Sequence, residues 1–188
     1  MPQVTIQDLT RDEGSDGAAT DWAFLVDLSN ASERPVSISY QTADGSATVA
    51  NGDYAPKSGV LNVPLGASRD TIRIPVVADT KDENDETFLV VLTSSIGADI
   101  ADSSAVGTIV DDDGTPSIAR DRGPELHQRG RRGFTPMKVT VALSNASAIG
   151  SIEVDYHTED GTATIANDDY VPTSGHLVFS PRPTARAS

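Results

Sequence analysis

The segment SYQTADGSATVANGDYAPKSGVL (39–61) recurs as DYHTEDGTATIANDDYVPTSGHL (155–177), 116 residues further along the chain. The tyrosine near the start, the Asp-Gly pair and the Asp-Tyr pair all realign at this one offset. A shorter string, LSNAS, occurs at 28–32 and again at 143–147. Identity this dense at a nearly constant offset indicates an internal repeat.

Apolar and polar residues alternate through most of the first repeat, which is the period of a half-buried β-strand. The alternation runs through 22–28, 36–40, 72–76, 88–92 and 106–110. Glycine-containing turn signals separate these runs, and no helical period appears. We therefore predict an all-β fold, an immunoglobulin-like antiparallel β-sandwich of about seven strands. The fold is expected to be repeated in tandem, with the second copy incomplete.

Two residues in these runs carry specific expectations. Trp22 is predicted to fill space between the two sheets of the sandwich. Pro75 lacks a backbone N–H, so its strand is predicted to lie at a sheet edge or to contain a bulge.

Acidic side chains are concentrated in the first repeat. Residues 1–114 carry 20 acidic and 6 basic side chains, whereas residues 115–188 carry 8 of each, so the first repeat holds the whole net charge of −14. Such a field repels nucleic acid and anionic lipid and attracts cations. We expect no nucleic-acid partner and no direct membrane insertion. A solubilising acidic surface is the simplest interpretation of the charge alone.

The sequence contains no cysteine, so disulfides and thiolate metal sites are excluded. It has no run of eighteen apolar residues, and its start, MPQVTIQDLT, lacks the basic and apolar regions of a signal peptide. The predicted location is extracellular or the cell surface, with any secretion signal outside this sequence.

Carboxylates gather where the predicted strands end, around Glu13, at Asp53, along 79–86 and at 111–113. Loops after alternate strands collect at one end of a sandwich, so residues far apart in sequence can meet there. Two unit charges about 6 Å apart repel by roughly 3 kcal/mol at an effective dielectric of 20. A hard divalent cation would remove this repulsion, and calcium accepts many oxygens in a flexible geometry.

Calcium is the cation that these loops favour. Magnesium demands a strict octahedron, and zinc prefers His or Cys, whereas the three histidines here are scattered. No EF-hand loop pattern is present. Solvated turn carboxylates without a metal remain the alternative explanation of the acidic residues.

Four separated motifs occur in order and together resemble the Calx-beta domain family. They are Glu13-Gly14, the block DGSATVANGDY (44–54) followed by SGVL (58–61), the segment DENDETF (82–88) and the ending GTIVDDD (107–113). Such domains occur in the cytosolic loop of sodium–calcium exchangers, in an integrin and in many bacterial surface proteins. The resemblance covers residues 1–114 and, in part, 133–180.

The resemblance implies a sandwich whose distal loops bind several calcium ions. The implied ligands are Glu13, Asp53, Asp79, Glu83, Glu86, Asp111, Asp112 and Asp113, together with the backbone carbonyl of Lys81. Ala78 stands where strong calcium binders of the family have Asp, and the Lys81 side chain adds a positive charge. Both departures imply fewer or weaker calcium sites. Asp44 and Asp160 are assigned to Asp-Gly turns rather than to metal.

The second repeat is predicted to be damaged. Residues 1–114 form a complete repeat, whereas 115–188 form a partial, degenerate one in which 115–132 and 181–188 are irregular. Both irregular stretches are rich in Arg and Pro, which suggests a degenerate fragment or a slip of the reading frame. Asp168 and Asp169 are its potential ligands, and the long acidic loop and the terminal aspartates are missing.

The leading functional hypothesis is a non-catalytic, calcium-binding structural or adhesion module of a larger surface protein. Calcium would stiffen the distal loops and the junction at 111–116, and the partners would be neighbouring repeats or another surface protein. A metal-independent interaction scaffold of the same fold is the alternative. An enzyme is disfavoured because no nucleophile-elbow motif or aromatic-rich substrate cleft is indicated.

Overall fold

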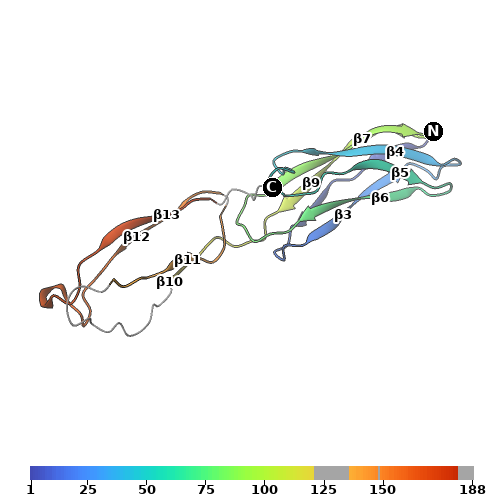
Figure 1. The fold of residues 1–188 in the computed structure, drawn as a ribbon. Coiled ribbons are helices and arrows are strands. Elements are labelled where there is room, and N and C mark those ends of the chain that lie inside the picture. Colours follow the sequence, from blue (N-terminus) through green and yellow to red (C-terminus); the bar gives the residue numbers. More distant parts are fainter. Residues whose placement is uncertain (121–135, 148, 182–188) are drawn as a thin grey trace. The chain divides into compact units, whose positions relative to one another are not determined.

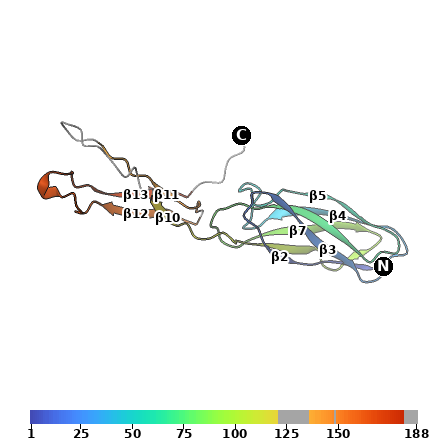
Figure 2. The ribbon, with the colours of Figure 1, turned by 90° about the horizontal axis from the view of Figure 1, so that it is seen from below.

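The computed structural model describes residues 1–120, 136–147 and 149–181. Contacts within the chain divide it into two compact units, Met1–Asp113 and Gly114–Pro183, which are described separately below. Figures 1 and 2 show the strands of each unit from two directions.

The first unit is a two-sheet β-sandwich, which confirms the predicted fold class. Its strands are β1 (Gln3–Ile6), β2 (Leu9–Asp12), β3 (Ala19–Leu28), β4 (Val36–Asp44), β5 (Ser58–Val63), β6 (Arg69–Val77), β7 (Glu86–Ile96), β8 (Asp99–Ile100) and β9 (Ser104–Val110). One sheet has the order β6-β3-β1-β8 and the other β2-β9-β7-β4-β5. The prediction was an antiparallel sandwich. Two of the pairings, β1 with β8 and β2 with β9, are parallel, so the sandwich is mainly but not purely antiparallel.

The parallel pairs arise because the N-terminal segment changes sheet. The chain pairs with β3 as β1, then crosses over and pairs with β9 as β2. This crossing leaves two short strands, one in each sheet.

Aromatic side chains form the centre of the first unit's core. Trp22, Phe24 and Phe88 are fully buried, which confirms the position predicted for Trp22. The Phe88 ring stacks on Tyr54 at 4.5 Å between centroids and meets Phe24 edge-on at 5.8 Å. These rings tie β3, β7 and the loop after β4 into one cluster.

The structure confirms the predicted position of one strand and corrects the buried side of another. The strand containing Pro75, β6, lies at a sheet edge as predicted. At 106–110 the pattern placed Val106, Thr108 and Val110 on the buried side of the strand. In β9 the other side is buried, and it carries Ala105, Gly107 and Ile109. A Cβ on Gly107 would lie 2.6 Å from the Phe88 ring, so the large ring of β7 occupies the space above this glycine.

Asp44 does not sit in a tight turn. It ends β4, and a long loop follows before β5 begins at Ser58. Its Oδ1 accepts hydrogen bonds from the Tyr54 hydroxyl at 2.6 Å and from the Val49 N–H at 3.1 Å. The carboxylate therefore holds the loop together, and the expectation of a simple Asp-Gly turn is corrected.

The second unit contains four strands in its described residues. They are β10 (Ile118–Arg120), β11 (Val141–Leu143), β12 (Ile152–His157) and β13 (Ser174–Phe179), with a single 3₁₀ turn, η1 (Ile165–Asn167), between β12 and β13. They pair as β10-β11 and β12-β13. Residues 118–120 form a strand, so the prediction that 115–132 is irregular is wrong there. The irregularity predicted for 121–132 and 182–188 falls outside the described residues.

Candidate metal centre

Three chain segments meet at one end of the first unit, and each carries acidic side chains. The parallel pairing of β2 with β9 sets Asp12 opposite Val110, so Glu13 and Asp111 leave neighbouring strands side by side. Their backbones stay joined, because the Glu13 N–H donates to the Val110 carbonyl at 3.1 Å. Asp79 follows the end of β6. The topology thus gathers residues that are about a hundred positions apart in the sequence.

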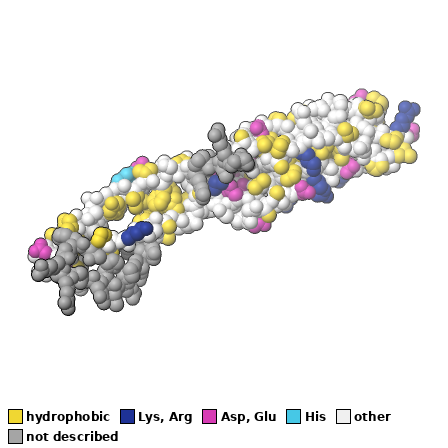
Figure 3. Space-filling model, in the orientation of Figure 1, with side chains coloured by type: hydrophobic (Ala, Val, Ile, Leu, Met, Phe, Trp, Pro, Cys, Tyr) yellow, Lys and Arg dark blue, Asp and Glu magenta, His cyan; other side chains and the backbone are white. Residues whose placement is uncertain are grey.

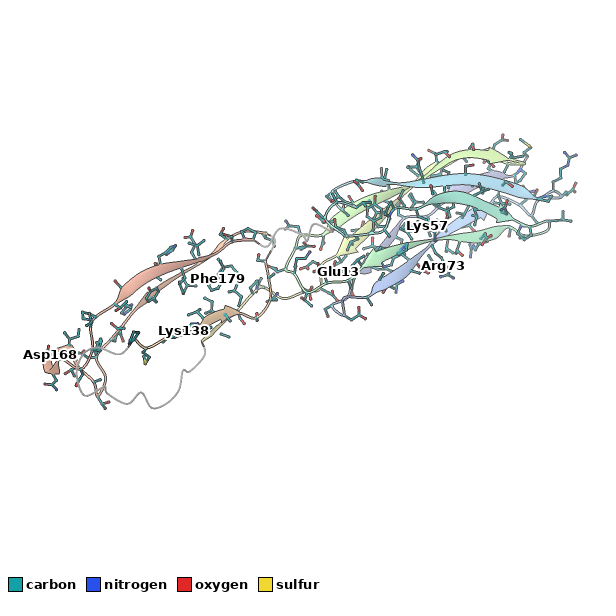
Figure 4. The ribbon with its side chains drawn as sticks, viewed as in Figure 1. Glu13, Lys57, Arg73, Lys138, Asp168 and Phe179 are labelled. Carbon is teal, nitrogen blue, oxygen red and sulfur yellow. The ribbon has the colours of Figure 1, made fainter. Side chains whose placement is uncertain are left out.

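Glu13, Asp79 and Asp113 form the tightest carboxylate group among the described residues. One ligand atom from each lies within 4.8 Å of the others. Glu13 is buried, with 8% of its surface exposed, and Asp79 and Asp113 are half-buried. Figure 4 places Glu13 at the end of the sandwich away from the N-terminus, which is marked in the same view in Figure 1.

The remaining predicted ligands lie around this group. We use "acidic rim" for the acidic residues of this end of the first unit: Glu13, Asp53, Asp79, Glu83, Glu86, Asp111, Asp112 and Asp113. The charges of Asp53 and Glu83 act on Glu86, and those of Asp111 and Asp113 act on Glu13. The structure therefore brings every predicted ligand residue to the same end. Their role as ligands remains a prediction.

Two rim carboxylates also support the backbone. An oxygen of Asp112 accepts a hydrogen bond from the Gly14 N–H at 3.1 Å, and Asp53 Oδ2 accepts one from the Thr48 N–H at 2.6 Å. Asp85, which the ligand prediction omitted although it lies in the DENDETF motif, accepts a bond from the Asp111 N–H at 3.2 Å. These bonds hold the acidic loops in place beside one another.

Lys81 contributes its side chain to the rim. Its ammonium forms ion pairs with Asp79 and with Glu83, the latter at 3.0 Å. Burial lowers the pKa of Lys81, but hydrogen bonds to the two carboxylates raise it above its usual value overall. The lysine therefore stays charged and neutralises part of the rim, as its positive charge suggested from the sequence.

Three rim oxygens are buried and accept no hydrogen bond from the described residues: Glu13 Oε1, Asp111 Oδ1 and Asp113 Oδ2. Burying a charged oxygen without a partner is costly, unless a proton or a cation compensates. Hard, oxygen-only ligands with irregular geometry suit calcium, whereas zinc would require imidazole or thiolate. The residues present therefore fit a calcium ion.

Burial and nearby negative charges raise the pKa values of five rim carboxyls: Glu13, Glu83, Glu86, Asp111 and Asp113. Burial, with the charges of Asp79 and Glu83 added, raises the pKa of Glu13 to about 8. Burial and the nearby Asp53 raise the pKa of Glu86 to about 7. The pKa values of Asp111 and Asp113 are also raised, first by burial. Without a metal, Glu13 and Glu86 therefore hold protons near neutral pH.

These shifts predict how the calcium-free protein responds to pH. Glu13 and Glu86 bind protons more tightly folded than unfolded, so their contribution to stability is present below their ordinary pKa of 4.5 and is lost as pH rises towards 7 and 8. In a chelator, we expect the thermal midpoint to fall by more than about 5 °C between pH 5 and pH 8. Scanning calorimetry at several pH values measures this. A midpoint that rises over the same range would contradict the protonated rim.

The Calx-beta domain family matches residues 7–113 and 126–187. The chain belongs to the Calx-beta family. The second matched range indicates that the family pattern continues into the second repeat, which agrees with the internal repeat seen in the sequence.

Curated relatives of this Calx-beta chain include two exchangers. The sodium/calcium exchanger Calx of Drosophila melanogaster is 31% identical over 144 residues, which is 76% of this chain and 15% of the exchanger. Sodium/calcium exchanger 1 of Rattus norvegicus is 30% identical over 162 residues, which is 77% of this chain and 16% of that protein. The chain therefore spans about one sixth of the length of these relatives.

Solved structures support the same fold. The crystal structure of CBD12 from CALX1.2 has a TM-score of 0.52 at 26% identity and covers 97% of this Calx-beta chain and 73% of its own. The structure described as calcium binding domain CBD12 of CALX1.1 has a TM-score of 0.51 at 26% identity, over 96% of this chain and 71% of its own. In the described residues of this chain, no helix is long and apolar enough to cross a membrane.

Proposed function

We propose that this chain is a non-catalytic, calcium-binding structural module of a larger protein. The observation that carries the proposal is the convergence of Glu13, Asp79 and Asp113 within 4.8 Å, with buried oxygens that accept no hydrogen bond from the described residues. A divalent cation would replace the proton on Glu13 and remove the repulsion among the three carboxylates. Related chains named as calcium binding domains support this assignment.

Calcium would act on the junction between the repeats. Asp113 is the last residue of the first unit, and Gly114 begins the second. A cation held by Asp111 and Asp113 would restrict the backbone where the chain leaves the sandwich. We propose that this stiffening is the structural role of the module in a tandem array, and that residues 1–114 form its complete repeat.

The alternative is a scaffold that does not need metal, and Lys81 favours it. Because this ammonium already neutralises Asp79 and Glu83, part of the rim is balanced without a cation. The two functions differ in their response to calcium, because the ion pairs of Lys81 are with Asp79 and Glu83 and leave the buried oxygens of Asp111 and Asp113 without a hydrogen-bond partner among the described residues.

The relatives differ in the kind of protein that carries the domain. The relatives include exchangers and also the extracellular matrix protein 3 of Lytechinus variegatus, 30% identical over 111 residues, which is 58% of this chain and 4% of that protein. The extracellular or cell-surface location, and adhesion through neighbouring repeats or another surface protein, therefore remain predictions about the longer protein.

Calcium titration of the full chain tests the proposed function. We expect isothermal titration calorimetry to show calcium binding, and the thermal midpoint of the first unit to rise by more than about 10 °C at millimolar calcium. Magnesium at the same concentration serves as the matched control and should give a much smaller rise. An unchanged midpoint in millimolar calcium would favour the metal-independent scaffold.

A further inference from the structure

Strands β12 and β13 of the second unit pair in the same register as β4 and β5 of the first. Val36↔Val63 on β4-β5 corresponds to Ile152↔Phe179 on β12-β13, and each hairpin has six matched pairs. Each residue of β12-β13 therefore has a counterpart in the complete first unit, which shows the side of the hairpin that faces solvent in a whole repeat.

One side of β12-β13 is the outer side of the repeat. In the first unit, the inward residues Val36 and Ile38 of β4 are fully buried, whereas Val60, on the outer side of β5, is 55% exposed. On β12 the same alternation leaves Glu153 and Asp155 exposed. The exposure of this side therefore does not depend on the strands that complete the second repeat.

Four side chains that can bind a metal ion share this outer side. We use "histidine patch" for them: Glu153, Asp155 and His157 on β12, and His176 on β13. Asp155 lies directly opposite His176 in the pairing, and His157 lies diagonally from His176. Diagonal neighbours on one side of an antiparallel pair are about 7–8 Å apart, within reach of long side chains. The histidines looked scattered in the sequence, but the strand pairing brings two of them together.

Both imidazoles of the histidine patch contact carboxylates. His176 Nδ1 lies 2.7 Å from Asp155 Oδ1, and its Nε2 lies 3.7 Å from Glu153 Oε2. His157 Nε2 lies 2.9 Å from an oxygen of Glu159, two residues further along the chain. Figure 3 shows histidine, in cyan, at the surface of the second unit with an acidic side chain beside it. The patch therefore already brings imidazole nitrogen and carboxylate oxygen together at the surface.

The first repeat has neither imidazole nor carboxylate at these four positions. The counterparts of the histidine patch are Ser37, Ser39, Gln41 and Val60. Since β4 and β5 pair in the same register without such groups, the fold of the hairpin does not require them. The patch therefore distinguishes the second copy from the first at an otherwise equivalent surface.

Other acidic side chains of the second unit support its loop. Asp160 Oδ1 accepts a hydrogen bond from the Tyr170 hydroxyl at 2.7 Å, as Asp44 does in the first unit, so the expectation of a simple Asp-Gly turn is corrected here too. Asp169 accepts a bond from the Thr164 N–H at 3.0 Å. These carboxylates hold the backbone of the loop, whereas those of the histidine patch face imidazoles.

Imidazole and carboxylate groups together favour zinc over calcium. Zinc binds imidazole nitrogen at about 2.1 Å and also accepts carboxylate oxygen, whereas calcium takes oxygen ligands. The hydrogen bond to Asp155 raises the pKa of His176, so an ion that binds this ring displaces a proton. With a metal on one ring nitrogen, a carboxylate at the other nitrogen fixes the tautomer and the orientation of the ring. Glu153 lies where it can provide this support.

We propose that His157, Asp155 and His176 bind a zinc ion that links β12 to β13. The His157 side chain is 66% exposed, so its ring can turn from Glu159 to the ion without disturbing the strand. Because the ligands come from both strands, binding would hold the hairpin together by mass action. All the ligands belong to the second unit, so the site is separate from the acidic rim of the first.

Isothermal titration calorimetry of the full chain with zinc chloride tests the site. We expect a single zinc site with a micromolar dissociation constant in a buffer that contains millimolar calcium. Hydrogen exchange of the amides at 152–157 and 174–179 should slow in zinc, because the ligands lie on both strands. Absence of binding at zinc concentrations up to about 100 µM, or slowing confined to other segments, would overturn the proposal.

Titrations with and without calcium separate this site from the acidic rim. The zinc site should keep its affinity within about twofold when millimolar calcium is added. Loss of all zinc binding in calcium would place the zinc at the acidic rim and overturn the proposal. A chain that binds no calcium would contradict the proposed function and leave the zinc test unchanged.

The first repeat supplies matched substitutions that keep the hairpin intact. His157→Gln and His176→Val each introduce the residue that the first repeat has at the equivalent position. Each should weaken zinc binding by at least about tenfold. His127→Gln changes the remaining histidine of the sequence and should weaken binding by less than about twofold. Equal losses for all three variants, or a loss with His176→Val alone, would overturn the site with two imidazoles.

Discussion

Replacement of Glu13 with Gln is expected to stabilise the calcium-free protein and to remove most of its stabilisation by calcium. Glu13 is buried, and its pKa is raised to about 8, so folding at pH 8 brings a carboxyl into surroundings that disfavour its charge. Gln has nearly the same shape and no charge to desolvate. At pH 8 in a chelator, the thermal midpoint should rise by about 4–8 °C.

The same substitution removes a carboxylate from the group that includes Asp79 and Asp113, so the rise in midpoint caused by millimolar calcium should fall to less than half. The matched control is Glu33→Gln, an exposed carboxylate in the loop between β3 and β4, at the other end of those strands. It should leave both midpoints unchanged. If Glu13→Gln destabilised the calcium-free protein and kept the full calcium response, Glu13 would have a purely structural role.

Replacement of Phe88 with Ala is expected to unfold the first unit at moderate temperature. The Phe88 ring is fully buried and meets the rings of Trp22, Phe24 and Tyr54. Removing a buried aromatic ring costs about 3–5 kcal/mol, and a domain of this kind is stable by only about 5–15 kcal/mol. Scanning calorimetry should show a fall in the midpoint of at least about 15 °C.

Loss of calcium binding at 37 °C should accompany the Phe88→Ala change, because β7 begins at the rim residue Glu86. Phe179→Ala is the control: Phe179 lies on the second unit and is only half-buried. It should leave the unfolding transition of the first unit in place. A shift of less than about 4 °C for Phe88→Ala would show that the aromatic cluster does not organise the core.

Local sequence patterns predicted the five longest strands of the first unit, β3, β4, β6, β7 and β9, because alternation along one strand reports which side is buried without reference to its partners. They missed the shorter strands β1, β2, β5 and β8. The pattern failed at β9. There the buried residues are Ala105, Gly107 and Ile109, and the small size of Gly107 makes sense only beside the Phe88 ring. Packing between distant strands decided that phase, and periodicity alone does not contain it.

For the acidic rim, too, the sequence predicted which residues are present, and only the structure gave their contacts. The acidic motifs and their likeness to the Calx-beta family could be read from the chain, as could the presence of a positive charge at Lys81. The pairing of this ammonium with Asp79 and Glu83 required coordinates. Coordinates were also required to distinguish the role of Asp85, which accepts a hydrogen bond from the Asp111 N–H, from that of Glu13, Asp79 and Asp113, which form the close carboxylate group.

The sequence by itself determined the repeat, the all-β class and the acidic residues at the ends of strands, because these depend on neighbours along the chain. Only the tertiary structure decided that Glu13, Asp79 and Asp113 meet, because their approach depends on the parallel pairing of β2 with β9 across about a hundred residues. It also decided that the second repeat keeps its strand register yet buries no hydrophobic side chain among its described residues. Burial depends on strands packed from elsewhere, whereas a hairpin sets its own register.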